Sequence, residues 1–160
     1  MRTGVFVGSF DPFTVGHASV VSRVLPLFDR LVIGVGVNER KHSMLTAEER
    51  TEAIERLYSD EPRIEVRQYN GLTADFARSV GARFIVKGVR SVRDFEYERE
   101  QADLNRMMGI ETIMIAAEPQ LASISSSVVR ELAHFGQDIT PFVAGKTKRQ
   151  TGTPDTTTTL

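Results

Sequence analysis

Short runs of Val and Ile that alternate with helix-like stretches constrain the fold of this chain more than any other feature. Most of the runs are nearly continuous in apolar residues, as expected of strands buried on both faces. Because strands and helices alternate, the pattern predicts an α/β fold with a doubly wound, five-stranded, Rossmann-like parallel sheet. The five runs lie at residues 5–7, 31–37, 64–66, 84–86 and 113–115.

The predicted helices have recognisable beginnings and ends. Residues 46–49, Thr-Ala-Glu-Glu, have the spacing of a capping box and predict that a helix begins there. Gly81 and Gly109 each follow a helix-like stretch and are placed to end it. Pro26 falls late in the first helical stretch, so we expect it to end or kink that helix.

The composition favours one compact domain. The chain has 160 residues, of which 41% are hydrophobic, enough for a core of its own. We expect residues 1–146 to form this domain and the Thr-rich tail, 147–160, to be disordered because it can bury almost nothing.

Charge and cysteine content exclude several functions. The formal net charge of −1 provides no basic field, so we expect neither nucleic acid nor a membrane as a partner. The chain has no cysteine, which excludes disulfides, thiolate zinc sites and a cysteine nucleophile. The first apolar run turns at Gly8, too early for a signal-peptide core, which favours a soluble cytoplasmic protein.

Three polar segments follow predicted strands. GSFDPFTVGH, residues 8–17, follows the first strand, and KGVR, residues 87–90, follows the fourth. SISSS, residues 123–127, follows the fifth strand and opens a helix. With a strand order of 3-2-1-4-5, a crevice would lie between the first and fourth strands, where such sheets bind ligands. The three segments are therefore expected to meet at one end of the sheet.

The residue types in these segments suit phosphate binding. Ser9 offers a hydroxyl, and His17 stands at a helix start, where backbone N–H groups and the dipole favour an anion. Lys87 and Arg90 add two cations. Residues 125–127, three serines at a second helix start, form another candidate anion site, and we expect the hydroxyls not needed for capping to serve the ligand.

Each segment also has a purely structural explanation when it is taken alone. SFDP, residues 9–12, is an ordinary turn sequence, and a histidine or a serine run at a helix start is usually a cap. Lys41 and the cations of 87–90 are ordinary surface residues by themselves. Only a functional site predicts that all of them follow strands at the same end of one sheet.

Four motifs, in this order, resemble the bacterial phosphopantetheine adenylyltransferase family. They are G-S-F-D-P-F-T-V-G-H, K-G-V-R, F-E-Y-E and I-S-S-S-V-V-R-E, and the likeness runs from Val5 to about Phe142. The T-x-G-H element alone marks the wider nucleotidyltransferase superfamily, whereas the set of four is much more specific. The resemblance implies an enzyme of coenzyme A biosynthesis that joins the adenylyl group of ATP to 4′-phosphopantetheine, giving dephospho-coenzyme A and pyrophosphate. It also implies Mg²⁺ as a cofactor and a homohexamer.

The resemblance assigns roles to individual residues. It implies that the catalytic residues are His17, Lys41, Arg90 and Ser126. The implied ATP-binding residues are Ser9, Phe10, His17, Gly88, Val89, Arg90, Glu98, Leu121, Ala122, Ser123, Ile124, Ser125, Ser126 and Ser127. The implied phosphopantetheine-binding residues are Ser9, Lys41, Leu72, Thr73 and Lys87.

The chain departs from the family pattern in two places. Lys87 stands where Arg is frequent, which exchanges a bidentate fork for a point charge. Leu121 and Ala122 replace a bulkier pair that contains an aromatic residue in some relatives. Both differences bear on substrate affinity more than on the reaction.

The expected mechanism needs no covalent intermediate. The phosphate of phosphopantetheine is already an anion and can attack the α-phosphorus of ATP in line, so the protein has to hold two anions and stabilise the added charge. Because no cage of carboxylates is visible, we expect no protein ligands for the metal and a Mg²⁺ that arrives on the ATP phosphates.

Two alternatives stay open. One is another nucleotidyltransferase, such as a nicotinate mononucleotide adenylyltransferase, although these usually carry H-x-G-H where Thr14 stands here. The other is a non-catalytic nucleotide-binding module. The intact residues Ser9, His17, Lys41 and Arg90 argue against it.

Overall fold

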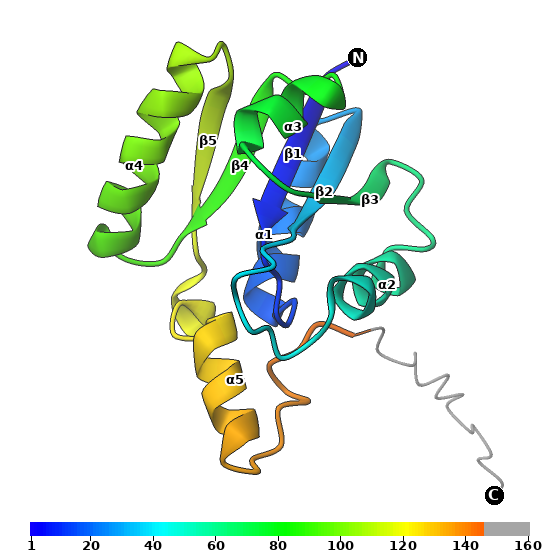
Figure 1. Ribbon diagram of the computed structural model, residues 1–160, viewed down its shortest axis with the longest axis vertical. Coiled ribbons are helices and arrows are strands. Elements are labelled where there is room, and N and C mark those ends of the chain that lie inside the picture. The colour runs from blue at the N-terminus through cyan, green and yellow to red at the C-terminus, as the bar shows by residue number, and fades with distance from the viewer. Residues whose placement is uncertain (146–160) are drawn as a thin grey trace, which may run out of the picture.

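Within the part of the chain that the structure describes, five parallel strands form a central sheet (Figure 1). The computed structural model describes residues 1–145, and the predicted disordered tail lies outside the described residues. The strand order is β3-β2-β1-β4-β5, and the strand pairs are parallel. The predicted α/β class and strand order are thus confirmed. The strands are β1 Thr3–Gly8, β2 Arg30–Gly36, β3 Ile64–Tyr69, β4 Phe84–Val89 and β5 Glu111–Ala116.

Helices cover both faces of this sheet, as a doubly wound fold requires. Helices α1 and α2 pack on one face, and α3 and α4 on the other, while α5 lies beyond the carboxyl ends of the strands (Figure 1). The helices are α1 Val15–Val24, α2 Ala47–Leu57, α3 Thr73–Ser79, α4 Val92–Met107 and α5 Ser126–His134, with 3₁₀ turns η1 Leu25–Leu27 and η2 Pro119–Leu121.

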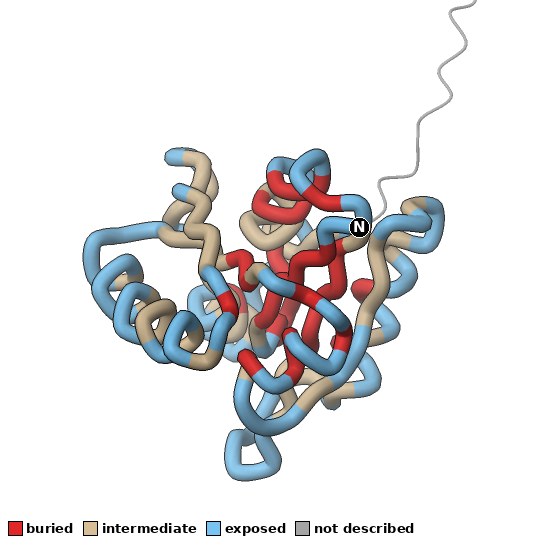
Figure 2. Tube along the Cα trace, turned by 90° about the horizontal axis from the view of Figure 1, so that it is seen from above, coloured by how far each residue is buried: buried red, intermediate tan, exposed pale blue. Residues whose placement is uncertain are grey.

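Alternating side chains of the central strands build two cores. Phe6 and Ile33 face the core shared with α1 and α2, whereas Val5, Val32 and Ile85 face the core that contains α3. Buried residues accordingly concentrate in the middle of the molecule (Figure 2). The edge strands β3 and β5 are only partly buried, so full burial on both faces holds for the central strands alone.

The predicted helix ends are largely confirmed. Thr46 accepts from the N–H of Glu49 and forms the expected capping box of α2. Helix α1 ends at Val24, just before Pro26, which lies in η1. Gly81 and Gly109 adopt φ of 72° and 82° beyond the ends of α3 and α4, the left-handed conformation typical of a helix C-terminus.

Several predicted strand boundaries are wrong. β1, β3 and β5 extend beyond the predicted runs, to Thr3–Gly8, Ile64–Tyr69 and Glu111–Ala116. Strand β2 ends at Gly36 rather than at Val37, and β4 extends through Val89. Residues 87–89 therefore belong to the strand instead of following it. The pairing with β5 continues as far as Val89 opposite Ala116, and these backbone hydrogen bonds override the loop-like sequence Lys-Gly.

Candidate active site

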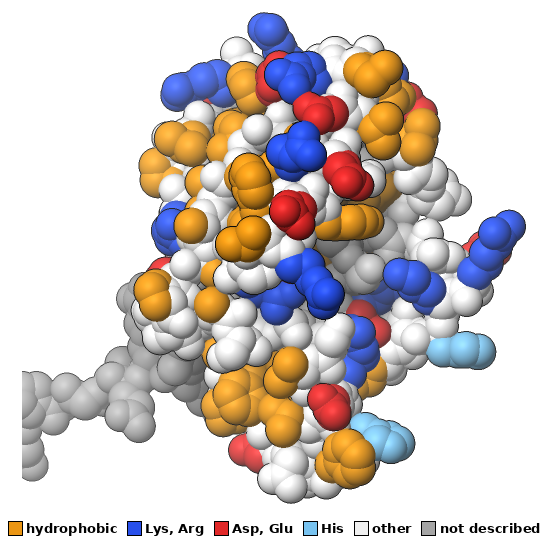
Figure 3. All heavy atoms as spheres, turned by 90° about the vertical axis from the view of Figure 1, so that its left-hand side faces the viewer, with side chains coloured by type: hydrophobic (Ala, Val, Ile, Leu, Met, Phe, Trp, Pro, Cys, Tyr) orange, Lys and Arg blue, Asp and Glu red, His pale blue; other side chains and the backbone are white. Residues whose placement is uncertain are grey.

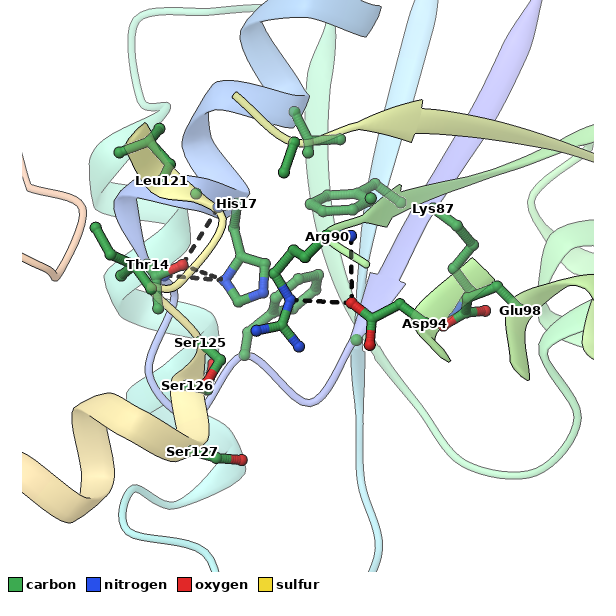
Figure 4. Close-up of a pocket in the computed structure, with 18 of the residues that line it drawn as sticks. Thr14, His17, Lys87, Arg90, Asp94, Glu98, Leu121, Ser125, Ser126 and Ser127 are labelled. Carbon is green, nitrogen blue, oxygen red and sulfur yellow. Dashed lines mark hydrogen bonds and ion pairs between the residues drawn. The ribbon is translucent and has the colours of Figure 1, made fainter. Parts of the chain in front are cut away.

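A cavity of about 320 Å³ lies beyond the carboxyl ends of β1 and β4, at the point where the strand order reverses (Figure 4). The start of α1, the end of β4, one face of α4 and the start of α5 line it. The three polar segments thus meet at the expected place. The predicted site residues that line the cavity are Phe10, His17, Lys87, Gly88, Arg90, Glu98, Leu121, Ile124, Ser125, Ser126 and Ser127.

The other predicted site residues lie outside this cavity. Lys41 is exposed in the loop between β2 and α2, and Leu72, 61% exposed, precedes α3. The Thr73 hydroxyl lies 3.2 Å from the hydroxyl of Tyr69. These residues follow β2 and β3, so they occupy the other half of the same sheet edge. The remaining residues outside the cavity are Ser9, Val89, Ala122 and Ser123.

A buried arginine holds the loop that follows β1. Arg50 is only 4% exposed, and its Nη1 donates to the carbonyl oxygens of Ser9 at 2.5 Å and Gly36 at 3.0 Å. Its Nε donates to the carbonyl oxygen of Thr46 at 3.2 Å. One guanidinium therefore ties the β1 loop to the end of β2 and the start of α2.

The carboxylate of Asp11 makes a second tie. Its two oxygens accept the backbone N–H groups of Met44 and Leu45, each at 2.8 Å. The carbonyl of the same residue accepts from Arg130 Nη1 of α5 at 2.7 Å. The Asp-Pro turn of the opening motif is therefore fixed from two sides.

Phe10 sits in a strained conformation beside the cavity. Its φ of 52° lies in the left-handed region, which costs a non-glycine residue about 1–2 kcal/mol. Its ring is buried and packs edge-on against His17, with centroids 5.0 Å apart. A Cβ at Gly8 would lie 2.9 Å from this ring, so the close approach requires glycine there.

Thr14 fixes the orientation of His17. The N–H of Thr14 donates to Nδ1 of His17 at 2.9 Å, and the Thr14 hydroxyl accepts from the N–H of His17 at 3.3 Å. Because Nδ1 accepts this hydrogen bond, the proton of the neutral ring resides on Nε2. Nε2–H is therefore the donor available to the cavity (Figure 4).

The surroundings of His17 keep its ring uncharged. Burial, followed by the positive charge of Arg90, lowers the pKa of His17 from 6.5 to about 4. The ring is thus neutral at pH 7. It can donate a hydrogen bond through Nε2–H, but it does not act as a positively charged acid.

Both cations of the cavity pair with carboxylates of α4 (Figure 4). Lys87 Nζ lies 3.4 Å from Glu98 Oε2, and Arg90 Nε lies 3.2 Å from Asp94 Oδ2. Asp94 and Glu98 are four residues apart, so they share one face of the helix. Glu98 Oε2 is buried and makes no hydrogen bond within residues 1–145, so its contact with Lys87 at 3.4 Å leaves this oxygen without a hydrogen-bond donor there.

The serine hydroxyls at the start of α5 all have partners within the protein. Ser125 is the N-cap and accepts from the N–H of Val128 at 3.1 Å. Ser126 donates to the carbonyl of Pro12 at 2.8 Å, and Ser127 accepts from Arg130 at 3.1 Å. That the hydroxyls beyond the cap serve the ligand stays a prediction, and Ser126 in addition joins α5 to the β1 loop.

Sequence reasoning missed two residues of the site. Thr14 and His17 have capping-box spacing, a signal that would have paired them. Asp94 follows Arg90 by four residues at a helix start, where opposite charges commonly pair. Neither signal by itself indicates a ligand site.

Known proteins share this combination of fold and motifs. The model of the cytidylyltransferase-like family matches residues 5–132. The phosphopantetheine adenylyltransferase of Phocaeicola vulgatus is 55% identical over 89% of this chain and 95% of its own length. That of Bacteroides fragilis is 53% identical over 89% of this chain and 96% of its own. The chain belongs to the phosphopantetheine adenylyltransferase family. It is accordingly a nucleotidyltransferase.

Solved structures support the fold of this phosphopantetheine adenylyltransferase family member. A putative nicotinate-nucleotide adenylyltransferase from Vibrio parahaemolyticus has a TM-score of 0.66 at 18% identity, covering 90% of this chain and 94% of that one. At this identity the likeness shows the fold alone.

Proposed function

We propose that the protein transfers the adenylyl group of ATP to 4′-phosphopantetheine, yielding dephospho-coenzyme A and pyrophosphate. The observation that carries this proposal is the cavity in which a neutral, oriented His17 stands beside Arg90 and Lys87. The strong likeness to curated relatives named for this reaction supports the choice of substrates.

The proposed chemistry is a direct displacement. A phosphate oxygen of phosphopantetheine bonds to the α-phosphorus of ATP as the bond to the β-phosphate oxygen breaks and pyrophosphate leaves. His17 Nε2–H donates to an α-phosphate oxygen, and Arg90 offsets the charge that accumulates on the phosphates. No general base is needed, because the attacking oxygen already carries negative charge.

The two halves of the sheet edge suit the two substrates. The cavity residues that follow β1, β4 and β5 would hold ATP. Leu72 and Thr73, which follow β3, would contact the pantetheine arm, with Ser9 and Lys41 between the two sites. Lys87 would bind the acceptor phosphate, and this contact would replace its ion pair with Glu98.

We expect Mg²⁺ to accompany ATP. The carboxylates nearest the cavity, Asp94 and Glu98, are already paired with cations, and residues 1–145 contain no cluster of three or more His, Cys, Asp or Glu able to hold a metal. The residues therefore fit an ion bound to phosphates and water better than a protein cage. Such an ion would supply further neutralisation of phosphate charge.

The proposal includes a homohexamer in the cytoplasm, as the family resemblance implies. Apolar side chains gather among charges on the face that carries α4 (Figure 3), and none of the residues of α4 is buried. Its exposed apolar residues are Val92, Phe95, Tyr97, Leu104 and Met107. None of the helices within residues 1–145 is long and apolar enough to cross a membrane.

A turnover assay tests the proposed function. The purified protein is mixed with ATP and Mg²⁺, and pyrophosphate release is followed with 4′-phosphopantetheine, with nicotinate mononucleotide, or with no acceptor. We expect release only with phosphopantetheine, together with a product of the mass of dephospho-coenzyme A. Release only with the mononucleotide would assign another nucleotidyltransferase activity, and ATP binding without release would indicate a non-catalytic module.

A further inference from the structure

One carboxylate oxygen next to the cavity makes two contacts with the same arginine. Asp94 Oδ2 lies 3.2 Å from Arg90 Nε, and it accepts the backbone N–H of Arg90, also at 3.2 Å. Asp94 is itself held, because its N–H donates to the hydroxyl of Ser91, the N-cap of α4, at 3.2 Å. Asp94, at the start of α4, thus contacts both the backbone and the side chain of Arg90.

These two contacts with Asp94 orient the guanidinium of Arg90. Nε is engaged towards α4, whereas the terminal nitrogens Nη1 and Nη2 make no hydrogen bond within residues 1–145. Figure 4 shows the guanidinium of Arg90 between Asp94 and the ring of His17. The two donors best suited to a phosphate therefore extend into the cavity next to Nε2 of His17.

We propose that Asp94 is a positioning residue that holds the terminal nitrogens of Arg90 against the phosphates undergoing transfer. The proposal rests on the function proposed above and adds a residue to its machinery. Arg90 is 41% exposed in its side chain, so without Asp94 its long side chain would adopt several orientations. The contact with Asp94 selects the orientation that places the guanidinium beside His17.

The charge of Asp94 makes a distinctive prediction possible. A carboxylate near a phosphate site repels the ligand, so its loss should not weaken the binding of ATP. If Asp94 acts by orienting Arg90, its loss should instead slow the chemical step, where geometry matters most. If Asp94 only stabilised the start of α4, its loss would lower the melting temperature but would change neither kcat nor KM for ATP.

The test compares Asp94→Asn with Asp103→Asn. Asp103 is a matched control because it lies on the same helix and pairs with Arg99 and Arg106, away from the cavity. We expect Asp94→Asn to lower kcat about 10-fold, with KM for ATP unchanged or up to about threefold lower. Asp103→Asn should leave both constants as they are. A higher KM for ATP with unchanged kcat in Asp94→Asn would overturn the proposal.

A double-mutant cycle tests whether Asp94 acts through Arg90. Lysine has no Nε donor and no planar fork to orient, so Asp94→Asn should cost less than about twofold in kcat in an Arg90→Lys background. An undiminished 10-fold loss in that background would overturn the positioning role.

A spectroscopic readout separates this proposal from the proposed function. In protein labelled with ¹⁵N-arginine, the Nε–H signal of Arg90 should exchange slowly with water in the wild type and more than about fivefold faster in Asp94→Asn. If the wild type fails to adenylylate phosphopantetheine but shows this difference, the function is wrong and the orientation of Arg90 by Asp94 stands. Equal exchange in both proteins would overturn the orientation itself.

Discussion

Thr14 decides which nitrogen of His17 faces the cavity. In an ordinary capping box the third helical residue is Glu or Gln, whose side chain accepts the N–H of the N-cap residue. Here His17 takes that place and accepts the Thr14 N–H with Nδ1. A local capping interaction therefore also sets the tautomer of a candidate catalytic residue.

Removing this donor should affect the reaction more than binding. We expect His17→Ala to lower kcat about 10²-fold to 10³-fold with little change in KM for ATP, as when one preorganised donor to developing charge is deleted. His17→Gln, which can still offer an N–H, should lose less. Steady-state kinetics of both variants checks this. A raised KM with normal kcat would show that His17 only binds the nucleotide.

The lowered pKa of His17 should appear as a pH dependence of stability. The unfolded chain takes up a proton near pH 6.5 and the folded one only near pH 4, so the free energy of unfolding should fall as the pH drops through that interval. The full loss is about 3–4 kcal/mol, because each pKa unit corresponds to about 1.4 kcal/mol.

Urea unfolding between pH 4 and 7 measures this effect in the wild type and in His17→Gln. Glutamine does not titrate, so the variant should have the shallower pH dependence. Identical slopes in the two proteins would show that His17 titrates normally in the folded state.

At the scale of elements, the start of α5 combines two tasks. Ser125 caps the helix, and Ser126 bonds the carbonyl of Pro12 in the β1 loop, 114 residues away in sequence. The first contact is local and the second holds two parts of the cavity wall together. Their loss should therefore have different consequences.

Paired alanine variants separate these tasks. Ser125→Ala should lower the free energy of unfolding by about 1 kcal/mol and leave turnover nearly unchanged. Ser126→Ala should lower stability by a similar amount and also reduce kcat, because the β1 loop, which leads into α1 and His17, loses one of its ties. Thermal unfolding and steady-state kinetics on both variants provide the data. A normal kcat in Ser126→Ala would show that the hydrogen bond from Ser126 to Pro12 stabilises the fold without affecting the reaction.

The elements differ in how far the sequence could predict them. The start of α2 depends on residues close together in sequence, and it was predicted correctly. The extension of β4 depends on its pairing with β5, which Lys-Gly does not reveal. Likewise the ties from Arg50 to Ser9 and from Ser126 to Pro12 join distant segments, so motif reasoning indicated candidate residues, many of which line the cavity, but not the partners that fix them.

At the scale of the whole molecule, the sheet edge brings distant segments together. The order β3-β2-β1-β4-β5 places β1 next to β4, so segments near residues 10, 90 and 125 meet at one cavity. The same topology leaves α4 on the outside of β4 and β5 (Figure 1). That position explains how one helix can line the cavity with carboxylates and still present apolar side chains outward.

The outward face of α4 should form contacts between copies of the chain. An exposed apolar face costs free energy in water, and burying it in a homo-oligomer recovers that cost.

Phe95 of α4 and Leu27 of η1 are each 46% exposed but lie on different elements, so Leu27 can serve as the matched control for Phe95. We expect Phe95→Glu to shift sedimentation from a hexamer towards smaller species, since a buried unpaired charge opposes association. Leu27→Glu should leave the assembly intact. Equal sedimentation of the wild type and both variants would place the contacts elsewhere, and a monomeric wild type would contradict the hexamer.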